Sequence, residues 1–133
     1  APVPCAVVDL DRRWPAIALG GAIGSLCRGG VVGLADDPSW PWPVLVVNVV
    51  GGALLGWLVG RGGLRSLSVT VGTGVGFCGG LTTMSALAVE VARLGRDGDV
   101  ATAGGYLAGT IVVGVAAAAA GLALGHRERA GRP

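Results

Sequence analysis

The residues best suited to binding an ion lie at 71–85, a stretch rich in glycine and then in hydroxyls. Five glycines occupy the nine positions 72–80, and Thr82, Thr83 and Ser85 follow them. Each glycine in a helix costs about 1 kcal/mol relative to alanine, so a continuous helix is disfavoured. Helices break at membrane depth where the freed backbone groups line a cavity or bind an ion. We expect a break within 79–83, with carbonyls that hold a cation and hydroxyls that face a pore. The alternative is a flexible, unbroken helix.

Three more polar side chains lie inside otherwise apolar stretches. Asn48 is the only amide of the chain and stands between valines. An amide in an apolar environment needs a partner or a wet path. A pore-lining donor and a helix–helix hydrogen bond are therefore both open for Asn48. Tyr106 and Thr110 are four residues apart, so they share a helix face and would add hydroxyls to a polar track.

The remaining reactive residue types do not form an enzyme active site. Arg28 and Glu90 are the ionisable groups closest to the interiors of apolar stretches, where they can anchor or pair, and no nucleophile–base pair is recognisable. The cysteines Cys5, Cys27 and Cys78 fit no zinc or disulfide framework. The net charge of +2 comes from scattered arginines without a basic patch. The sequence therefore argues against an enzyme and against a nucleic-acid partner.

Four charge-free stretches must position these groups, at 14–27, 38–60, 66–89 and 100–125. A helix needs about 20 mostly apolar residues to cross the hydrocarbon core of a membrane. Of this chain, 52% is apolar and only 14% is charged. The sequence predicts an all-α integral membrane protein with spans at 14–34, 44–60, 67–92 and 100–125. A flexible leader at 1–13 and a basic tail at 126–133 flank these spans, and residues 93–99 form a charged loop.

Small residues and arginines indicate how the spans pack and how they are oriented. Glycines four apart allow close helix contact in lipid, and such pairs occur at 20/24, 52/56, 76/80, 105/109 and 121/125. Four crossings place both termini on one side. That side carries seven arginines and the other three, which predicts cytoplasmic termini in the cell inner membrane. The seven are Arg12, Arg13, Arg61, Arg65, Arg127, Arg129 and Arg132, and the three are Arg28, Arg93 and Arg96.

Four segments together resemble the CrcB/Fluc family of fluoride channels. Residues 20–28 read GGAIGSLCR and are similar to the family's GGxxGAxxR, and residues 45–51 read LVVNVVG and are similar to LxVNxxG. Residues 76–85 read GFCGGLTTMS and, with Glu90, resemble the signature GFCGGLTTFSTF…E. Tyr106 falls where the family has a pore tyrosine. The resemblance covers about residues 14–125.

The resemblance implies an antiparallel dimer with two pores, passive fluoride export and a sodium ion at the dimer interface. Backbone carbonyls of Gly79 and Thr82 would hold the sodium, and Arg28 would be a structural anchor. Fluoride holds its water tightly, so its pore must offer closely placed partial positive charges from amides, hydroxyls and ring edges. The pore-lining set that the resemblance implies is Asn48, Thr83, Met84, Ser85, Leu87, Tyr106 and Thr110.

The chain departs from the family pattern where the pore needs aromatic rings. Met84 and Leu87 stand where the family has phenylalanines, Ala86 replaces a threonine, and Gly114 replaces a serine. Residues 43–44 read PV where the family usually has glycine-threonine. A homodimer would lack its fluoride-coordinating rings. The arginine bias also favours one fixed orientation, so we expect a heterodimer with an oppositely oriented paralogue that carries the phenylalanines.

Two other functions remain open for a four-span chain. A small multidrug-type exporter needs a carboxylate in the first span, and 14–34 has none. A non-conducting structural subunit of a fluoride channel is compatible with the missing aromatic rings. Fluoride flux through a mixed dimer distinguishes the conducting subunit from the structural one.

Overall fold

The computed structural model describes residues 13–33, 40–63 and 67–131, and within these ranges helices are the only regular secondary structure. The elements are α1 (Trp14–Gly33), α2 (Trp42–Gly60), α3 (Leu67–Val71), the π-helix η1 (Gly72–Cys78), α4 (Gly79–Leu81), α5 (Met84–Arg96) and α6 (Val100–Ala130). Four stretches are long and apolar enough to cross a membrane: Trp14–Gly33, Trp42–Gly60, Val69–Arg96 and Val100–Ala130. The predicted all-α, four-span architecture is confirmed.

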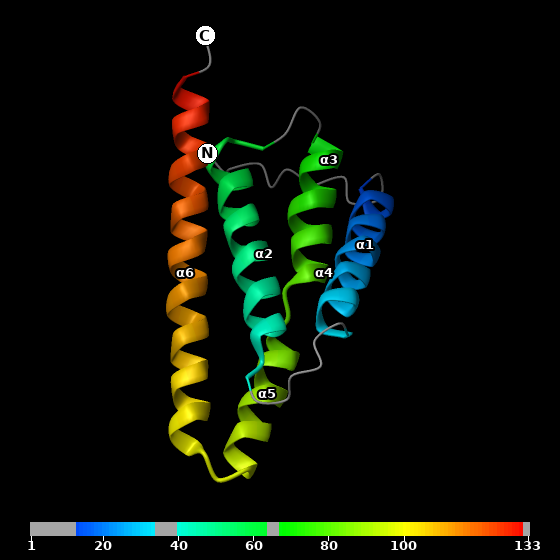
Figure 1. Ribbon diagram of the computed structural model, residues 1–133. Helices are drawn as coiled ribbons and strands as arrows, with labels where there is room; N and C mark the ends of the chain where they lie inside the picture. The colour runs from blue at the N-terminus through cyan, green and yellow to red at the C-terminus, as the bar shows by residue number, and fades with distance from the viewer. Residues whose placement is uncertain (1–12, 34–39, 64–66, 132–133) are drawn as a thin grey trace, which may run out of the picture.

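The spans lie side by side and alternate in direction (Figure 1). The line of elements α3, η1, α4 and α5 forms the third span, between α2 and α1 at its upper end. The beginning of α1 and the end of α6 lie at the same end of the bundle. We call this the terminal end. Residues 1–12 of the predicted leader and residues 34–39, 64–66 and 132–133 lie outside the described residues.

Several predicted boundaries were wrong, each for a local reason. Helix α2 begins at Trp42 because Pro43 fits the first turn, where its missing N–H is not needed. Helix α5 continues through Arg96, so residues 93–96 are helical and the predicted loop is shorter. Helix α6 extends to Ala130 rather than ending at 125, with Arg127 and Arg129 in its last turn. Cations at that position interact favourably with the helix dipole.

The length of α6 carries it beyond the other spans. Its 31 residues correspond to about 46 Å at 1.5 Å per residue, whereas the hydrocarbon core is about 30 Å thick. Figure 1 shows its C-terminal end projecting past α2 and α3. Asp99 caps the other end, with Oδ1 accepting a 2.8 Å hydrogen bond from the Thr102 amide. Hydrogen bonds from the Thr102 side chain and backbone lower the pKa of Asp99.

Glycine contacts hold the spans together in two pairs. Helix α2 packs on α6, where a Cβ at Gly56 would overlap the backbone of Ala118 and one at Gly121 would overlap that of Ala53. Such contacts require residues without side chains, because helices in lipid associate by close backbone approach. Gly60 and Gly125 make equivalent contacts.

The second pair is α1 with η1 and α4, and it is built in the same way. A Cβ at Gly20 would overlap the Gly72 carbonyl, and one at Gly24 would overlap the Phe77 carbonyl. Gly76 and Gly80 face α1 from the other side. Four of the five predicted glycine pairs therefore lie at helix contacts. At the fifth pair, 105/109, a Cβ on either glycine would meet no described atom within 4 Å.

Candidate functional site

The third span is interrupted at Thr82 and Thr83, inside the interval that the sequence indicated. Their backbone angles are extended, with φ −78° and ψ 153° at Thr82 and φ −151° and ψ 122° at Thr83. The Thr82 amide still donates to the Cys78 carbonyl at 3.0 Å. The Thr83 amide instead donates to Asn48 Oδ1 at 2.7 Å. In an uninterrupted helix it would donate to the Gly79 carbonyl, so the interruption frees that oxygen.

Asn48 binds both polar groups of the Thr83 backbone. Its Oδ1 accepts from the Thr83 amide, and its Nδ2 donates to the Thr83 carbonyl at 3.1 Å. The carboxamide thus replaces the peptide partners that Thr83 lacks outside a helix. Of the two roles open for Asn48, the helix–helix contact is present in the structure. The pore-lining role would use the second Nδ2 hydrogen and stays a prediction.

Arg28 reaches the interruption from α1. Its Nη1 donates to the Thr82 carbonyl at 3.3 Å, in a partly buried contact. The guanidinium therefore lies at the level of the interruption rather than beyond the far end of α1. This contact is of the kind that a structural anchor makes, and it compensates one of the carbonyls that the end of α4 leaves without a helical partner.

The hydroxyls around the interruption bind the scaffold itself. Thr82 Oγ1 donates to the Cys78 carbonyl at 2.9 Å. Thr83 Oγ1 caps α5 by accepting from the Ala86 amide at 3.2 Å, and it lies 3.1 Å from Ser85 Oγ. Ser85 is exposed on the subunit and Thr83 is buried. Only the Thr83–Ser85 pair retains a hydroxyl hydrogen that could serve a further acceptor.

Tyr106 and Thr110 are both buried between α6 and its neighbours. The Tyr106 hydroxyl donates to the Pro41 carbonyl at 3.1 Å, and its ring meets Trp40 edge-on at a centroid distance of 5.3 Å. Thr110 is 5% exposed, and its Oγ1 has no hydrogen-bond partner within the described ranges. The Tyr106 hydroxyl therefore binds the chain just before α2, while the Thr110 hydroxyl could bind a further group.

The two positions that replace family phenylalanines differ sharply in their surroundings. Met84 begins α5 and is 73% exposed in the subunit. Leu87 is 4% exposed and belongs to a core cluster that includes Val44 and Tyr106. A side chain at 84 can therefore meet a partner, whereas one at 87 packs within the subunit.

A groove runs from α2 along η1 to the interruption. It has a volume of about 240 Å³, and Gly79 and Thr82 are among its lining residues. Gly51, Gly52 and Gly74 also line it, and without side chains they leave their backbone atoms at its surface. Among the described residues, no group of three or more His, Cys, Asp or Glu side chains could hold a metal ion. A cation in this groove would depend on backbone oxygens.

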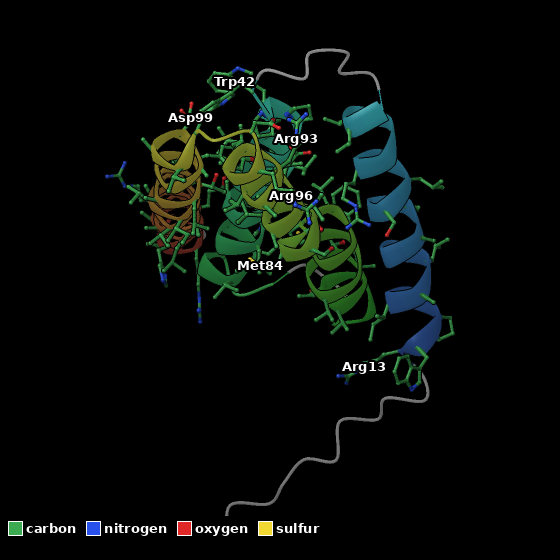
Figure 2. All side chains as sticks on the ribbon, turned by 90° about the horizontal axis from the view of Figure 1, so that it is seen from below. Arg13, Trp42, Met84, Arg93, Arg96 and Asp99 are labelled. Carbon is green, nitrogen blue, oxygen red and sulfur yellow. The ribbon has the colours of Figure 1, made fainter. Side chains whose placement is uncertain are left out.

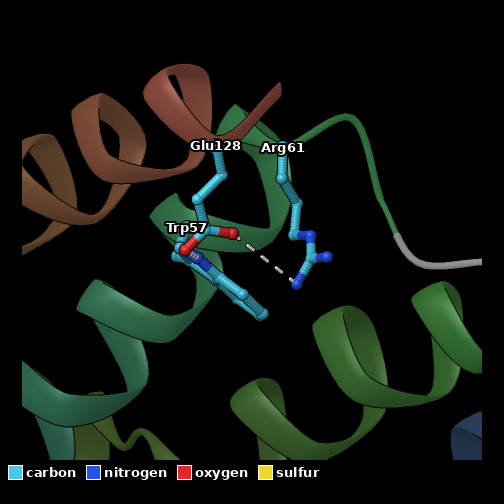
Figure 3. Close-up of polar contacts among 3 residues, drawn as sticks. All are labelled: Trp57, Arg61 and Glu128. Carbon is cyan, nitrogen blue, oxygen red and sulfur yellow. Dashed lines mark hydrogen bonds and ion pairs between the residues drawn. The ribbon is translucent and has the colours of Figure 1, made fainter. Parts of the chain in front are cut away.

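A polar cluster at the terminal end had no signal in the sequence (Figure 3). Trp57 Nε1 donates to Glu128 Oε1 at 3.1 Å, and Arg61 Nη1 lies 4.0 Å from Glu128 Oε2. The Arg61 guanidinium also stacks 4.2 Å above the Trp57 ring centroid. Trp57 and Glu128 are 71 residues apart, so only the packing of α6 on α2 brings them together. At the other end Glu90 pairs with Arg93 at 2.9 Å, one turn along α5.

Comparisons with known proteins agree with this architecture. Residues 15–122 match the family model described as CrcB-like protein, Camphor Resistance (CrcB). A fluoride-specific ion channel FluC of Methanopyrus kandleri is 39% identical over 91% of this chain and 95% of its own length. FluC of Paracoccus denitrificans is 43% identical over 83% of this chain and 91% of its own. FluC 1 of Rhodococcus jostii is 40% identical over 96% of both chains.

Proposed function

The chain belongs to the CrcB family, and from this membership we propose that it is a fluoride channel subunit that lets fluoride leave the cytoplasm passively. The family resemblance of the sequence is confirmed. The chain is a multi-pass membrane protein and not an enzyme, because its relatives are named fluoride-specific ion channels over nearly their whole lengths. The observation that carries the proposal is this similarity, which spans the interrupted helix and the asparagine that binds it.

The chemistry around the interruption suits a small anion. Helix α5 begins there, and the N-terminus of a helix presents amide hydrogens and the positive end of its dipole. Asn48, Thr83 and Ser85 surround that start. Fluoride must exchange its water for such donors. We propose that the pore passes this point, with Thr110 and Tyr106 further along it.

We propose a sodium ion at the carbonyls of Gly79 and Thr82. The Gly79 carbonyl has lost its helical donor, and the Thr82 carbonyl keeps a second lone pair beside its contact with Arg28. Both residues line the open groove. A Cβ built at Gly79 would have no other atom within 4 Å, so there is open space beside it. These oxygens suit a hard cation. When bound, the ion would supply a fixed positive charge that favours anions nearby.

We propose that an antiparallel second subunit covers this groove and that it is a paralogue. The exposed Met84 lies where a partner can reach it but brings no ring edge to an anion. Charge supports a fixed orientation, with cytoplasmic termini in the inner membrane. The sequence has seven arginines on the terminal side of the spans and three, Arg28 among them, on the other.

Fluoride efflux from liposomes tests the proposal. The chain is reconstituted alone, with its paralogue, and as Met84→Phe alone, in sodium and in a sodium-free buffer. We expect efflux only with the paralogue or, weakly, with Met84→Phe, and loss of efflux without sodium. Robust efflux from the unaltered chain alone would overturn the heterodimer. No efflux in any combination would overturn the channel assignment.

A second function is favoured by the missing rings at 84 and 87: a structural subunit that does not conduct. The mixed dimer distinguishes the conducting role from the structural role. For this test, a substitution in the paralogue closes the pore that the paralogue's rings line. Remaining flux assigns a conducting path to this chain, and complete loss assigns it the structural role.

A further inference from the structure

A second groove opens on the side of the third span opposite to the groove that Gly79 and Thr82 line. It has a volume of about 500 Å³ and is lined by side chains of α1, α2, α3 and η1. Thr73 and Phe77 of η1 border it, whereas Val75 and Gly79 border the groove at the interruption. Residues two apart on a helix point in nearly opposite directions. The two grooves therefore lie on opposite faces of the subunit. We call the larger one the α1 groove.

The α1 groove is apolar and lies at membrane depth. Its lining includes Leu19, Ile23, Val69 and Leu54, and Thr73 is its only polar side chain. Leu19 is 64% exposed and Val69 is 52% exposed. Among the lining side chains only Thr73 could bind a water molecule, which needs two to four polar partners, and an empty groove would forfeit the dispersion contacts of its walls. The volume is in the range of sites that enclose a small molecule, about 300–1,000 Å³.

A cation and an aromatic ring stand at the membrane-surface end of this groove. The groove follows α1 from Ala16 to Ile23, and Arg13 precedes Ala16 by one turn toward the terminal end. Figure 2 shows the Arg13 side chain leaving the end of α1 on the side of the other helices. Trp14 is 57% exposed beside it. Tryptophan marks the headgroup level of a bilayer, so the guanidinium lies at the depth of lipid phosphates.

We propose that the α1 groove binds one acyl chain of a phospholipid whose anionic headgroup is held by Arg13. The assignment to lipid rests on the proposed function in one respect: the antiparallel partner covers the other groove, so this face looks into the bilayer. The apolar α1 groove, about 10 Å long, complements the acyl chain. The Arg13 guanidinium at its end complements the anionic phosphate. The site is distinct from the ion path.

Photolabelling of the reconstituted two-subunit channel tests the site. The probes are phosphatidylglycerol and phosphatidylcholine with the same diazirine-bearing acyl chain, each added to phosphatidylcholine vesicles. Adducts are mapped by mass spectrometry, and fluoride efflux is measured on the same vesicles. We expect adducts concentrated at Leu19, Ile23 and Val69. Phosphatidylglycerol should label about five-fold more strongly, since one arginine near an anionic lipid changes binding by about that factor.

Variants separate the acyl-chain and headgroup parts of the site. Val69→Trp, and independently Leu19→Trp, fill the groove and should lower its labelling several-fold. Val113→Trp is the control, at an exposed α6 position (46% exposed) away from the groove. Arg13→Gln should make the two lipids label equally. Labels spread evenly over α1 and α6 would overturn the site, and unchanged lipid preference in Arg13→Gln would overturn the headgroup contact.

The partner subunit provides the remaining alternative occupant. If labelling of the groove occurs in the chain alone but disappears when the paralogue is added, the groove seats the partner and the lipid site is wrong. Labelling that persists in the active pair supports the lipid. Absence of efflux with intact labelling would count against the proposed function only, so the two failures are distinguishable.

Discussion

Removing the Asn48 side chain tests whether one amide holds the interrupted helix in place. Asn48→Ala deletes the 2.7 Å and 3.1 Å hydrogen bonds to the Thr83 backbone. Thr83 is only 9% exposed, so solvent cannot readily replace them. Hydrogen bonds between membrane helices average about 0.6 kcal/mol and reach about 1.7. Two of them predict a loss of about 1–3 kcal/mol in the free energy of unfolding. The Thr83 amide and carbonyl would then be buried without a partner, at a cost of about 1–3 kcal/mol each. We therefore expect the loss in the free energy of unfolding to lie in the upper half of that range.

Asn48→Asp provides a sharper control because its effect depends on pH. A protonated carboxyl accepts from the Thr83 amide and donates to its carbonyl, as the amide does, whereas a carboxylate repels the carbonyl. The free energy of unfolding of Asn48→Asp should therefore be highest where the carboxyl is protonated, and it should fall as the pH rises and the carboxyl ionises. Asn48→Ala should show no such dependence.

Two measurements test these predictions for the Asn48 variants. One is unfolding in a titration of denaturing detergent, and the other is amide hydrogen exchange at Thr83. The exchange rate should increase by about ten-fold for each 1.4 kcal/mol lost locally. An Asn48→Ala variant within about 0.5 kcal/mol of the parent, the range of neutral substitutions, with unchanged exchange would refute the reasoning. A flat pH profile for Asn48→Asp would refute it independently.

Three other substitutions, and Gly109→Ala as a matched control for the first of them, probe the scaffold in the same detergent assay. Gly56→Ala should lose about 1–3 kcal/mol by overpacking α2 against α6, whereas Gly109→Ala, which meets no described atom, should leave the single chain unchanged or slightly more stable; equal losses would contradict the glycine contacts. Tyr106→Phe removes the hydrogen bond to the start of α2 and should cost about 0.5–1.5 kcal/mol; no loss would mean that the bond contributes nothing. Arg28→Met should cost about 1 kcal/mol, since the bond to the Thr82 carbonyl is long and charge-assisted, and it should slow fluoride efflux; unchanged stability and efflux would contradict the anchoring role.

The position of the interruption illustrates what a sequence can and cannot predict. Glycines at 72–80 and hydroxyls after them indicated the right interval, because those residue types weaken a helix whatever surrounds it. The two residues that leave the helix, Thr82 and Thr83, were not predictable. The choice depends on Asn48, 35 residues away in sequence from Thr83, and on Arg28 from a third element. Such partners are decided by helix rotation, which hydropathy does not encode.

The direction of a side chain on its helix is another feature that a motif does not predict. The family motif places Met84 and Leu87 in one pore-lining set, and that role stays a prediction for both. Yet Met84 stands at the exposed start of α5, while Leu87 is one turn inside and packs against α2 and α6. The end of α6 lies beyond the predicted residue 125, although residues 126–130 are exposed as a basic tail would be. Glu128 there binds Trp57 and lies within 4.0 Å of Arg61, and both contacts come from tertiary packing rather than local pattern.

The hydrogen-bonding capacity that remains around the interruption argues for a second subunit. The Thr82 and Tyr106 hydroxyls donate to carbonyls of this chain, and Asn48 commits its oxygen and one of its two N–H groups to Thr83. Among the side chains named here, what remains is one amide hydrogen of Asn48, one hydroxyl hydrogen from the Thr83–Ser85 pair, and the hydroxyl of Thr110, to which the first backbone N–H groups of α5 add. An ion that holds its water as tightly as fluoride needs more closely placed donors than these. Since the chain offers neither phenylalanine ring at 84 or 87, the second subunit that we propose would supply the further partial positive charges, and the exposed face around Met84 is where it could do so.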